Sequence, residues 1–249
     1  MRVDWAALRA ELAIWRHEGL DLPIWWRDDD AVEDTPELRQ MVDLATELSL
    51  PVHLAVIPKL AAEGLAAVCA DTACLVPVVH GWAHVNHAGE GQKKAEFGAL
   101  RAAAEGEISQ GLVRVKQLFK NGILPFFVPP WNRIDAGFLP PLAAAGYLGV
   151  STYTPRRARE VVPGLVQINT HMDPIFWKQN KGLVPPEAQV SALVQLLTDR
   201  RMGRTDAAEP LGMLTHHLVQ DAPTWEFTRA CLSELLSGGA RVADLAKLP

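Results

Sequence analysis

The sequence predicts an α/β protein, a single distorted (β/α) barrel of about seven strands. Short apolar runs alternate with longer amphipathic stretches along the chain, which is typical of strand–helix units around a parallel sheet. With 249 residues, of which 49% are hydrophobic, the chain has the size and the apolar content of one globular domain. No internal repeat, low-complexity tract or Ser/Gly linker divides it, so we expect one domain over residues 1–249.

Seven apolar runs are the predicted strands, at residues 24–27, 52–57, 75–79, 125–128, 148–152, 165–169 and 211–215. Helices are predicted near residues 36–49, 59–70, 92–119, 136–146, 187–201 and 222–236. The first of these helices has a start signal, because Thr35 can cap free backbone N–H groups and Pro36 suits the first helical position. Segments 153–164, 178–186 and 202–210 are rich in Pro, Gly and charge and are predicted as loops on the barrel rim.

The net charge of the chain indicates which kind of partner it binds. A net charge of −5 argues against nucleic-acid binding, which needs clustered Lys and Arg, so we expect a small or neutral molecule as partner.

The N-terminal residues mix charged with apolar side chains, unlike a secretory signal, and no later stretch is long and apolar enough to cross a membrane. We therefore expect a cytoplasmic protein that is not membrane-bound. Its three cysteines are expected to be reduced and structural.

Residues with reactive side chains gather where the predicted strands end. The segments concerned are 27–30, 80–84, 129–131, 171–173 and 216–217, each directly after an apolar run. Parallel α/β barrels carry their active sites at this end of the strands. The sequence therefore predicts a site at the barrel mouth.

Two of these segments have the residue types of a metal site. The triplet Asp28, Asp29 and Asp30 concentrates like charges, which a cation or an Arg would neutralise, although a solvated loop that caps the next helix would look the same. His80 and His84 are spaced so that both imidazoles can reach one point if the segment turns helically. Two histidines and a carboxylate leave a coordination position open for water, which suits Zn²⁺ or a similar ion.

The other strand ends offer aromatic and titratable groups. Trp82, Trp131 and Trp177 can form a wall on which a sugar ring stacks, or can simply fill the barrel mouth. In the pair His216 and His217, an imidazole can protonate a leaving amine, or can serve as a helix cap. For His87 three roles are open: a fourth metal ligand, a residue that hydrogen-bonds to a ligand, or a surface residue.

Taken in order, these segments resemble the five motifs of the polysaccharide deacetylase family, also called carbohydrate esterase family four. The similar segments are 27–31 for T-F-D-D-G, 80–85 for H-[ST]-x-x-H-P, 128–131 for R-x-P-[YW], 173–177 for the Asp/Trp motif and 214–216 for L-x-H. They cover residues 24–217, most of the chain. The resemblance implies a barrel and a metal-dependent hydrolase that removes an acyl group from a carbohydrate.

The resemblance also implies roles for individual residues. The metal ligands are then Asp30, His80 and His84, with Asp29 as general base and His216 as general acid. The triplet leaves an alternative register open, in which Asp28 is the base and Asp29 the ligand. Asp173 is expected to orient His216 and to favour its charged form, and the backbone N–H near Trp131 to help bind the oxyanion.

Several departures of this sequence from the family pattern bear on the chemistry. Val128 stands where the family has an Arg that holds the base ionised, so Arg27 or Arg133 has to supply that charge. Gly81 replaces the Ser/Thr after the first His, and Val85 replaces the Pro after the second. The alternatives to sugar deacetylation are hydrolysis of a small non-sugar amide and a turnover-deficient barrel that only binds sugars.

Overall fold

The computed structural model describes residues 2–120 and 122–247, and its centre is one curled, mostly parallel sheet. The strand order is β6-β7-β5-β4-β3-β2-β1-β8, with β9 also paired to β1. Every pairing between named strands is parallel except that of β6 with β7. The bounds are β1 (Pro23–Ala31), β2 (Val52–Val56), β3 (Leu75–His80), β4 (Phe126–Val128), β5 (Gly149–Val150), β6 (Glu160–Val162), β7 (Leu165–Gln167), β8 (Leu211–Thr215) and β9 (Arg241–Val242).

The seven predicted runs each contain a strand, and the predicted barrel class is confirmed. The two additional strands, β6 and β9, are short and lie at the sheet margins. The sheet closes on itself after β7, where Met172 bridges to Met213 of β8 and Leu214 N donates to Met172 O at 2.7 Å. Gly212 is required at this closure, because a Cβ there would lie 2.5 Å from Trp25 Nε1 and 2.7 Å from Asn169 O.

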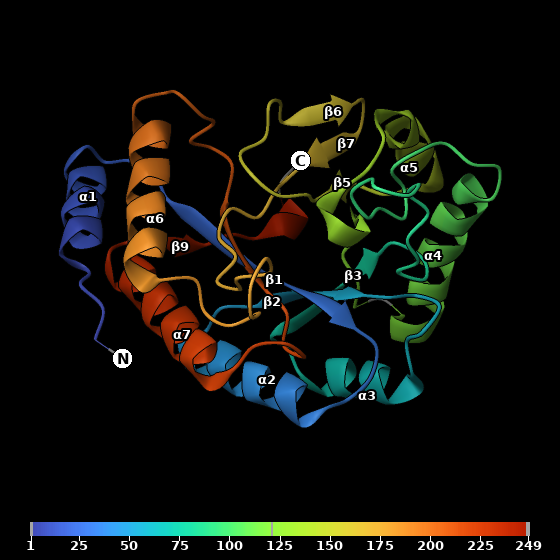
Figure 1. The fold of residues 1–249 in the computed structure, drawn as a ribbon, viewed down its shortest axis with the longest axis horizontal. Helices are drawn as coiled ribbons and strands as arrows, with labels where there is room; N and C mark the ends of the chain where they lie inside the picture. Colours follow the sequence, from blue (N-terminus) through green and yellow to red (C-terminus); the bar gives the residue numbers. More distant parts are fainter. Residues whose placement is uncertain (1, 121, 248–249) are drawn as a thin grey trace.

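Helices surround the sheet, and the first of them stands outside the sixth, as Figure 1 shows. They are α1 (Ala6–His17), α2 (Pro36–Leu48), α3 (Glu63–Asp71), α4 (Ala104–Phe119), α5 (Leu139–Ala145), α6 (Pro186–Arg201) and α7 (Ala222–Ser237). Thr35 caps α2 as predicted, with its side chain accepting from Leu38 N at 3.1 Å. No described helix is long and apolar enough to traverse a bilayer.

Two helix predictions were wrong. Helix α1 was not predicted; it packs on α6 with Leu8, Leu12 and Trp15 buried along one face, so its stability comes from that packing. The helix predicted over residues 92–119 begins only at Ala104. Residues 92–103 instead run irregularly over the barrel rim, because Phe97 leaves the helical path to pack against Phe127 and Phe138.

Strand alternation divides the apolar side chains into two cores. Trp25, Ala55, Val78 and Phe126 belong to one cluster, which fills the barrel. Their sequence neighbours, such as Trp26 and Phe127, belong to a larger cluster together with the buried faces of the helices. Two successive residues of one strand therefore face different environments, which decides the roles of the polar residues at the strand ends.

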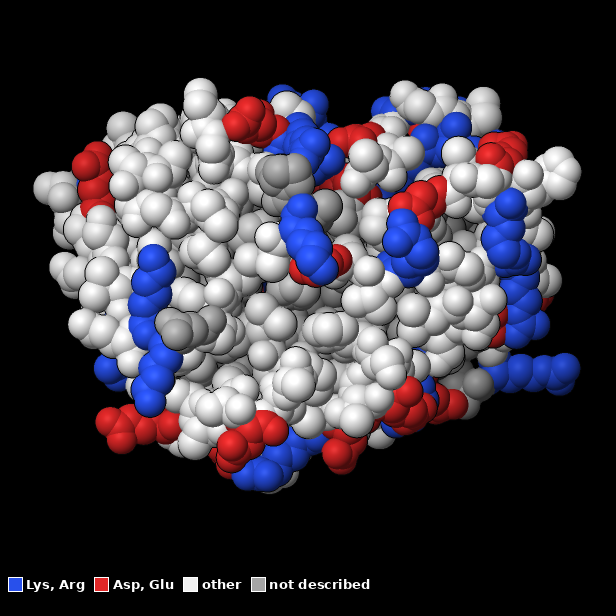
Figure 2. All heavy atoms as spheres, turned by 180° about the vertical axis from the view of Figure 1, so that it is seen from behind, with Lys and Arg blue, Asp and Glu red and all other residues white. Residues whose placement is uncertain are grey.

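The reverse of the molecule is shown in Figure 2. Basic and acidic side chains are interspersed there around a broad uncharged area.

Candidate metal and catalytic site

Asp30, His80 and His84 meet at the barrel mouth. His80 Nε2 lies 3.1 Å from Asp30 Oδ1, and His84 Nε2 lies 3.2 Å from the same oxygen. One ligand atom from each of the three residues lies within 4.8 Å of the ligand atoms of the other two. Two imidazoles and one carboxylate are a donor set that suits a borderline divalent ion such as Zn²⁺, so these residues fit the metal that the resemblance implies.

The backbone is unusual at this point. Asp30 and His84 have φ angles of 74° and 56°, and Trp131 and Asn132, across the mouth, have 56° and 57°. In addition, the β1–β2 register shifts between Asp28 and Ala31. Left-handed backbone is costly for non-glycine residues and concentrates at functional sites. At Asp30 the alternation of side chains between the two faces of β1 is interrupted. This irregularity directs Asp30 toward His80 and His84.

Hydrogen bonds and charges tune the three candidate ligands. His80 Nδ1 lies 3.0 Å from Val128 O, which fixes the ring so that Nε2 faces Asp30. Burial opposes ionisation of Asp30, but the hydrogen bond and charge of His80, with smaller contributions from His216 and His84, hold its pKa well below the usual range. Burial and the neighbouring His80 lower the pKa of His84, which favours the neutral imidazole that a metal requires.

Asp29 points into the barrel and is paired with Arg27. The pair is bidentate, with Nε to Oδ1 at 2.9 Å and Nη2 to Oδ2 at 3.0 Å, and both side chains are almost fully buried. Arg27 is held in turn by Asn132 Oδ1 at 2.6 Å and by Ser151 Oγ at 2.7 Å. Of the two arginines that sequence reasoning offered, Arg27 therefore supplies the charge beside Asp29.

Arg133, predicted among the catalytic residues, lies elsewhere. Its Nη1 donates to Lys94 O at 2.7 Å, and the residue is exposed. The side chain follows the 3-10 turn that starts at Pro130 and is directed to the irregular segment 92–103. It anchors that loop and makes no described contact with Asp29.

Asp28 points to the opposite side of β1 and is fully buried. Its Oδ1 lies 2.5 Å from His217 Nδ1, and its Oδ2 accepts from Thr215 Oγ1 at 2.5 Å and from His217 N at 3.0 Å. Burial lowers the pKa of His217, but the charge and the hydrogen bond of Asp28 outweigh burial and raise it. Asp28 and His217 thus form a buried pair between barrel and helices, away from the three candidate ligands.

His216 faces the mouth. Its ring lies edge-on to Trp177, with 4.7 Å between ring centroids, and its Nδ1 is buried without a partner among the described residues. Trp177 Nε1 donates to Asp173 Oδ2 at 2.7 Å, and Asp173 Oδ1 accepts from Ile175 N at 3.0 Å. Burial raises the pKa of Asp173, while His216 acts in the opposite direction. Asp173 therefore interacts with His216 electrostatically, and indirectly through the Trp177 ring that lies between them in the chain of contacts. No direct hydrogen bond joins Asp173 and His216 in the described contacts.

Of the remaining predicted residues, Trp131 and Trp177 contact site histidines, whereas Trp82 and His87 do not in the described contacts. Trp131 packs against His84 with 4.3 Å between centroids. Trp82 is half-buried beside the main core, and Trp177 is 42% exposed, which leaves a face free for a ligand. His87 is exposed and outside the ligand group; its N–H donates to Ala95 O at 2.9 Å.

Sequence reasoning missed two residues that hold this site, Asn132 and Glu96. Asn132 accepts from Arg27, and Glu96 accepts from the backbone between His80 and His84. The adjacent R-x-P-[YW]-like segment points to Asn132, since it follows Trp131 directly. Glu96 gives no such signal, because it lay within a predicted helix.

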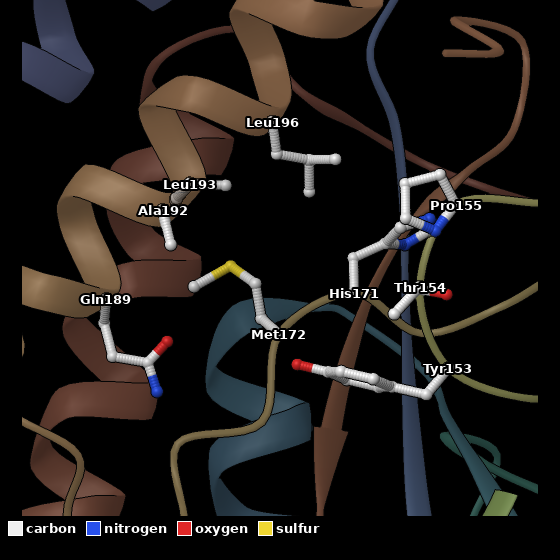
Figure 3. Close-up of a pocket in the computed structure, with 9 residues that line it drawn as sticks. All are labelled: Tyr153, Thr154, Pro155, His171, Met172, Gln189, Ala192, Leu193 and Leu196. Atoms are coloured by element: carbon white, nitrogen blue, oxygen red, sulfur yellow. The ribbon is translucent and has the colours of Figure 1, made fainter.

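Two cavities lie along the segment that follows β5. The smaller, of about 160 Å³, is lined by Tyr153, Met172 and the inner face of α6, and Figure 3 shows the Tyr153 hydroxyl directed toward Met172. The larger, of about 400 Å³, has Thr152, Gln167, Asn169 and Arg156 among its lining residues. Thr152, which lines the larger cavity, also accepts a hydrogen bond from Arg27 Nη1 through its carbonyl at 3.2 Å. The larger cavity therefore lies next to the Arg27–Asp29 pair.

Solved structures identify the fold. A family 4 carbohydrate esterase from Streptomyces lividans, in complex with acetate, is 14% identical and superposes with a TM-score of 0.54 over 90% of this chain and 92% of its own. A family 4 acetyl xylan esterase from Clostridium thermocellum, in complex with a cobalt ion, is 13% identical with a TM-score of 0.53 over 90% and 89%. The chain has the fold of the family 4 carbohydrate esterases.

The same fold is shared by a protein without the family's activity. A family 4 pseudoenzyme from Bacillus anthracis is 13% identical, with a TM-score of 0.53 over 92% of this chain and 65% of its own. No protein-family model matches the sequence, and no curated protein matches it either. The expected resemblance is thus confirmed for the fold, while the chemistry has to be argued from the residues of the site.

Proposed function

We propose that the protein is a divalent-metal-dependent hydrolase that removes an acetyl-like N-acyl group from a carbohydrate or a sugar-containing molecule. One observation carries the proposal: a three-ligand group, a buried carboxylate and an inward-facing histidine open on the same barrel mouth. The solved structures of this fold include an esterase with bound acetate and an acetyl xylan esterase with bound cobalt, which supports acyl transfer as the chemistry.

The candidate ligands are Asp30, His80 and His84, in the later of the two registers. Asp28 is engaged by His217 and Thr215 on the other side of β1, so it is poorly placed to act as base. A divalent ion held at this site, Zn²⁺ in our proposal, supplies Lewis-acid chemistry for the acyl carbonyl and the attacking water.

The side chains around the ligands divide the proton transfers. Asp29 takes a proton from the attacking water, and Arg27 balances its charge in a buried setting. His216 donates a proton to the departing nitrogen, with Trp177 and Asp173 behind it. The backbone N–H of the strained turn at Trp131 is proposed to help bind the oxyanion.

The substrate is proposed from the lining of the mouth. Trp131 and the exposed ring of Trp177 offer faces on which a sugar ring can stack, and polar side chains line the larger cavity nearby. A small non-sugar amide fits the same reacting groups but leaves these aromatic faces unused. The turnover-deficient alternative rests on Val128 in place of the family Arg, and the Arg27–Asp29 pair argues against it.

The proposal is tested on purified protein in two steps. Metal analysis should find about one divalent ion per chain, lost in the His80→Ala/His84→Ala double variant. Acetate release is then measured from a panel of N-acetylated and O-acetylated sugars and matched non-sugar amides. Asp29→Asn should keep the ion and lose roughly two orders of magnitude in turnover. Full metal retention in the double variant would refute the site, and turnover confined to non-sugar amides would refute the substrate class.

A further inference from the structure

The turn that carries His84 is capped by a carboxylate from a distant loop. Glu96 is 1% exposed, and its Oε1 accepts from Ala83 N at 2.8 Å and from Val85 N at 3.4 Å. Its Oε2 accepts from Trp82 N at 3.1 Å. Three backbone N–H groups of one short turn therefore converge on one buried side chain.

Glycine at position 81 makes room for this cap. Gly81 has a φ of 55°, and a Cβ there would lie 2.1 Å from Glu96 Oε2 and 2.6 Å from Pro130 Cδ. No other side chain fits beside Glu96 without displacing it or the Pro130 ring. Gly81 is one of the positions where this chain departs from the family pattern, which has Ser or Thr there, and the buried carboxylate of Glu96 occupies the space that a side chain would need.

The loop around Glu96 is anchored on both sides. Ala95 N donates to Asn86 Oδ1 at 3.0 Å, and its carbonyl accepts from His87 N at 2.9 Å. Phe97 is fully buried, and its carbonyl accepts from Asp135 N at 2.8 Å. Both sequence neighbours of Glu96 are therefore fixed, Ala95 by the residues that follow His84 and Phe97 by the core and Asp135.

The charge of Glu96 is also unusual. Burying a carboxylate costs several kcal/mol unless hydrogen bonds or opposite charges compensate. The described ion pairs give Glu96 no cationic partner, so three neutral N–H groups are its direct compensation. Arg101 acts on Glu96 by its charge without an ion pair, and a cation held by Asp30, His80 and His84 would add a second opposite charge on the other side of the turn.

We infer that Glu96 is a positioning residue of the metal centre, which, together with Gly81, holds His84 in place and sets the affinity of the site for a divalent ion. The inference rests on the proposed metal site and adds to it a residue from outside the motif segments. Removal of a residue that orients a metal ligand without binding the metal typically weakens metal affinity by about 10- to 100-fold.

The test is a metal titration of the full-length protein after chelator treatment. Zn²⁺ dissociation constants are measured by competition with a chromophoric chelator for the wild type, Glu96→Ala, Glu96→Gln and Glu90→Ala. Glu90 is an exposed carboxylate of the same loop and serves as the matched control. We expect about 10- to 100-fold weaker binding for Glu96→Ala, a smaller loss for the isosteric Gln, and no change for Glu90→Ala.

A second readout separates positioning from general destabilisation. With saturating Co²⁺, a displaced His84 should alter the visible absorption bands in Glu96→Ala and in Gly81→Ala, whereas Glu90→Ala should match the wild type. If Glu96→Ala does not fold, the Gln variant decides by its affinity and spectrum. Wild-type affinity and spectrum in the folded Glu96 variants would overturn the inference and leave the metal site standing. A wild type that binds no divalent ion would instead refute the metal site itself.

Discussion

Arg27 resolves a charge conflict at the scale of single residues. Three consecutive aspartates emerge from β1, and the family Arg that would balance the base is Val128 in this chain. Arg27 stands two residues before Asp29, so both side chains project from the same face of the strand. The guanidinium then spans Asp29, Asn132 and Ser151. The missing charge is thus supplied from the first motif itself.

Substitution of Arg27 should damage the base without removing the metal ligands. Arg27→Met leaves Asp29 buried beside other carboxylates without its ion-pair partner, so turnover should fall by about tenfold or more. Arg133→Met is the matched control, because the Arg133 side chain donates to Lys94 O and has no described hydrogen bond to Asp29. Unchanged turnover in Arg27→Met, or an equal loss in Arg133→Met, would contradict this assignment.

The acid role of His216 can be separated from substrate binding by the leaving group. An amine must be protonated as it departs, whereas an activated aryl alcohol needs little protonation. His216→Ala should therefore lower amide turnover by about two orders of magnitude and reduce hydrolysis of an aryl acetate much less. Both substrates are assayed with the same protein, and His87→Ala is the control from the exposed histidine outside the site. Equal losses for the two substrates would show that His216 is not the acid.

At the scale of elements, β1 and β8 end in residues that alternate between two functions. Arg27, Asp29 and His216 face the barrel mouth, while Asp28, Thr215 and His217 face the layer between sheet and helices. Trp26 Nε1 adds a 2.8 Å hydrogen bond to Thr215 Oγ1. Asp28, Thr215 and His217 therefore connect the ends of β1 and β8. These are the two strands that carry Arg27, Asp29 and His216 at the mouth.

Loss of His217 should weaken this connection. His217→Ala leaves the fully buried Asp28 carboxylate without its charged partner, and breaking a buried pair in this way typically costs about 3–5 kcal/mol of unfolding free energy. Chemical denaturation of the metal-free protein measures the loss, with His87→Ala as the exposed control. A change below about 0.5 kcal/mol would be the scale of an ordinary surface site and would contradict the buried pair.

At the scale of the whole molecule, the sequence predicts the barrel well because its strands are short apolar runs that end in polar residues. The same pattern predicts that the aspartate triplet meets His80 and His84, since parallel strands end at one mouth, whereas the choice of Asp30 within the triplet came from the resemblance to the family motif. The choice between Arg27 and Arg133 could have been made from strand alternation alone. The path of residues 92–103, and with it Glu96, depends on Phe97 packing against β4 and η2 (Ala136–Phe138), which no local pattern reveals.

Helix α1 marks a different limit of sequence reasoning. Its apolar residues have helical spacing, but they are mixed with charges, and Trp5 at its start provides no side-chain cap. Much of its stabilisation comes from α6, nearly two hundred residues away, where Arg201 Nε donates to Glu11 Oε1 at 2.8 Å. A local window does not contain that partner.

The last prediction concerns the pH dependence of the stability of the whole barrel. His53 lies in β2 on the same side as Ala55, against the edge of Trp25, and its Nδ1 is 3.2 Å from Trp26 O. Burial lowers the pKa of His53 to about 4, from an ordinary value near 6.5. Between these two values the unfolded chain binds a proton that the folded protein excludes, so acidification favours unfolding through this window, by at most about 3 kcal/mol in total. His53→Gln has a similar size and does not titrate, so its unfolding free energy should change less between pH 7 and pH 4 than that of the wild type. Urea denaturation of both metal-free proteins at several pH values measures the difference. Parallel pH curves for the two proteins would show that His53 is protonated in the fold as readily as in the unfolded chain.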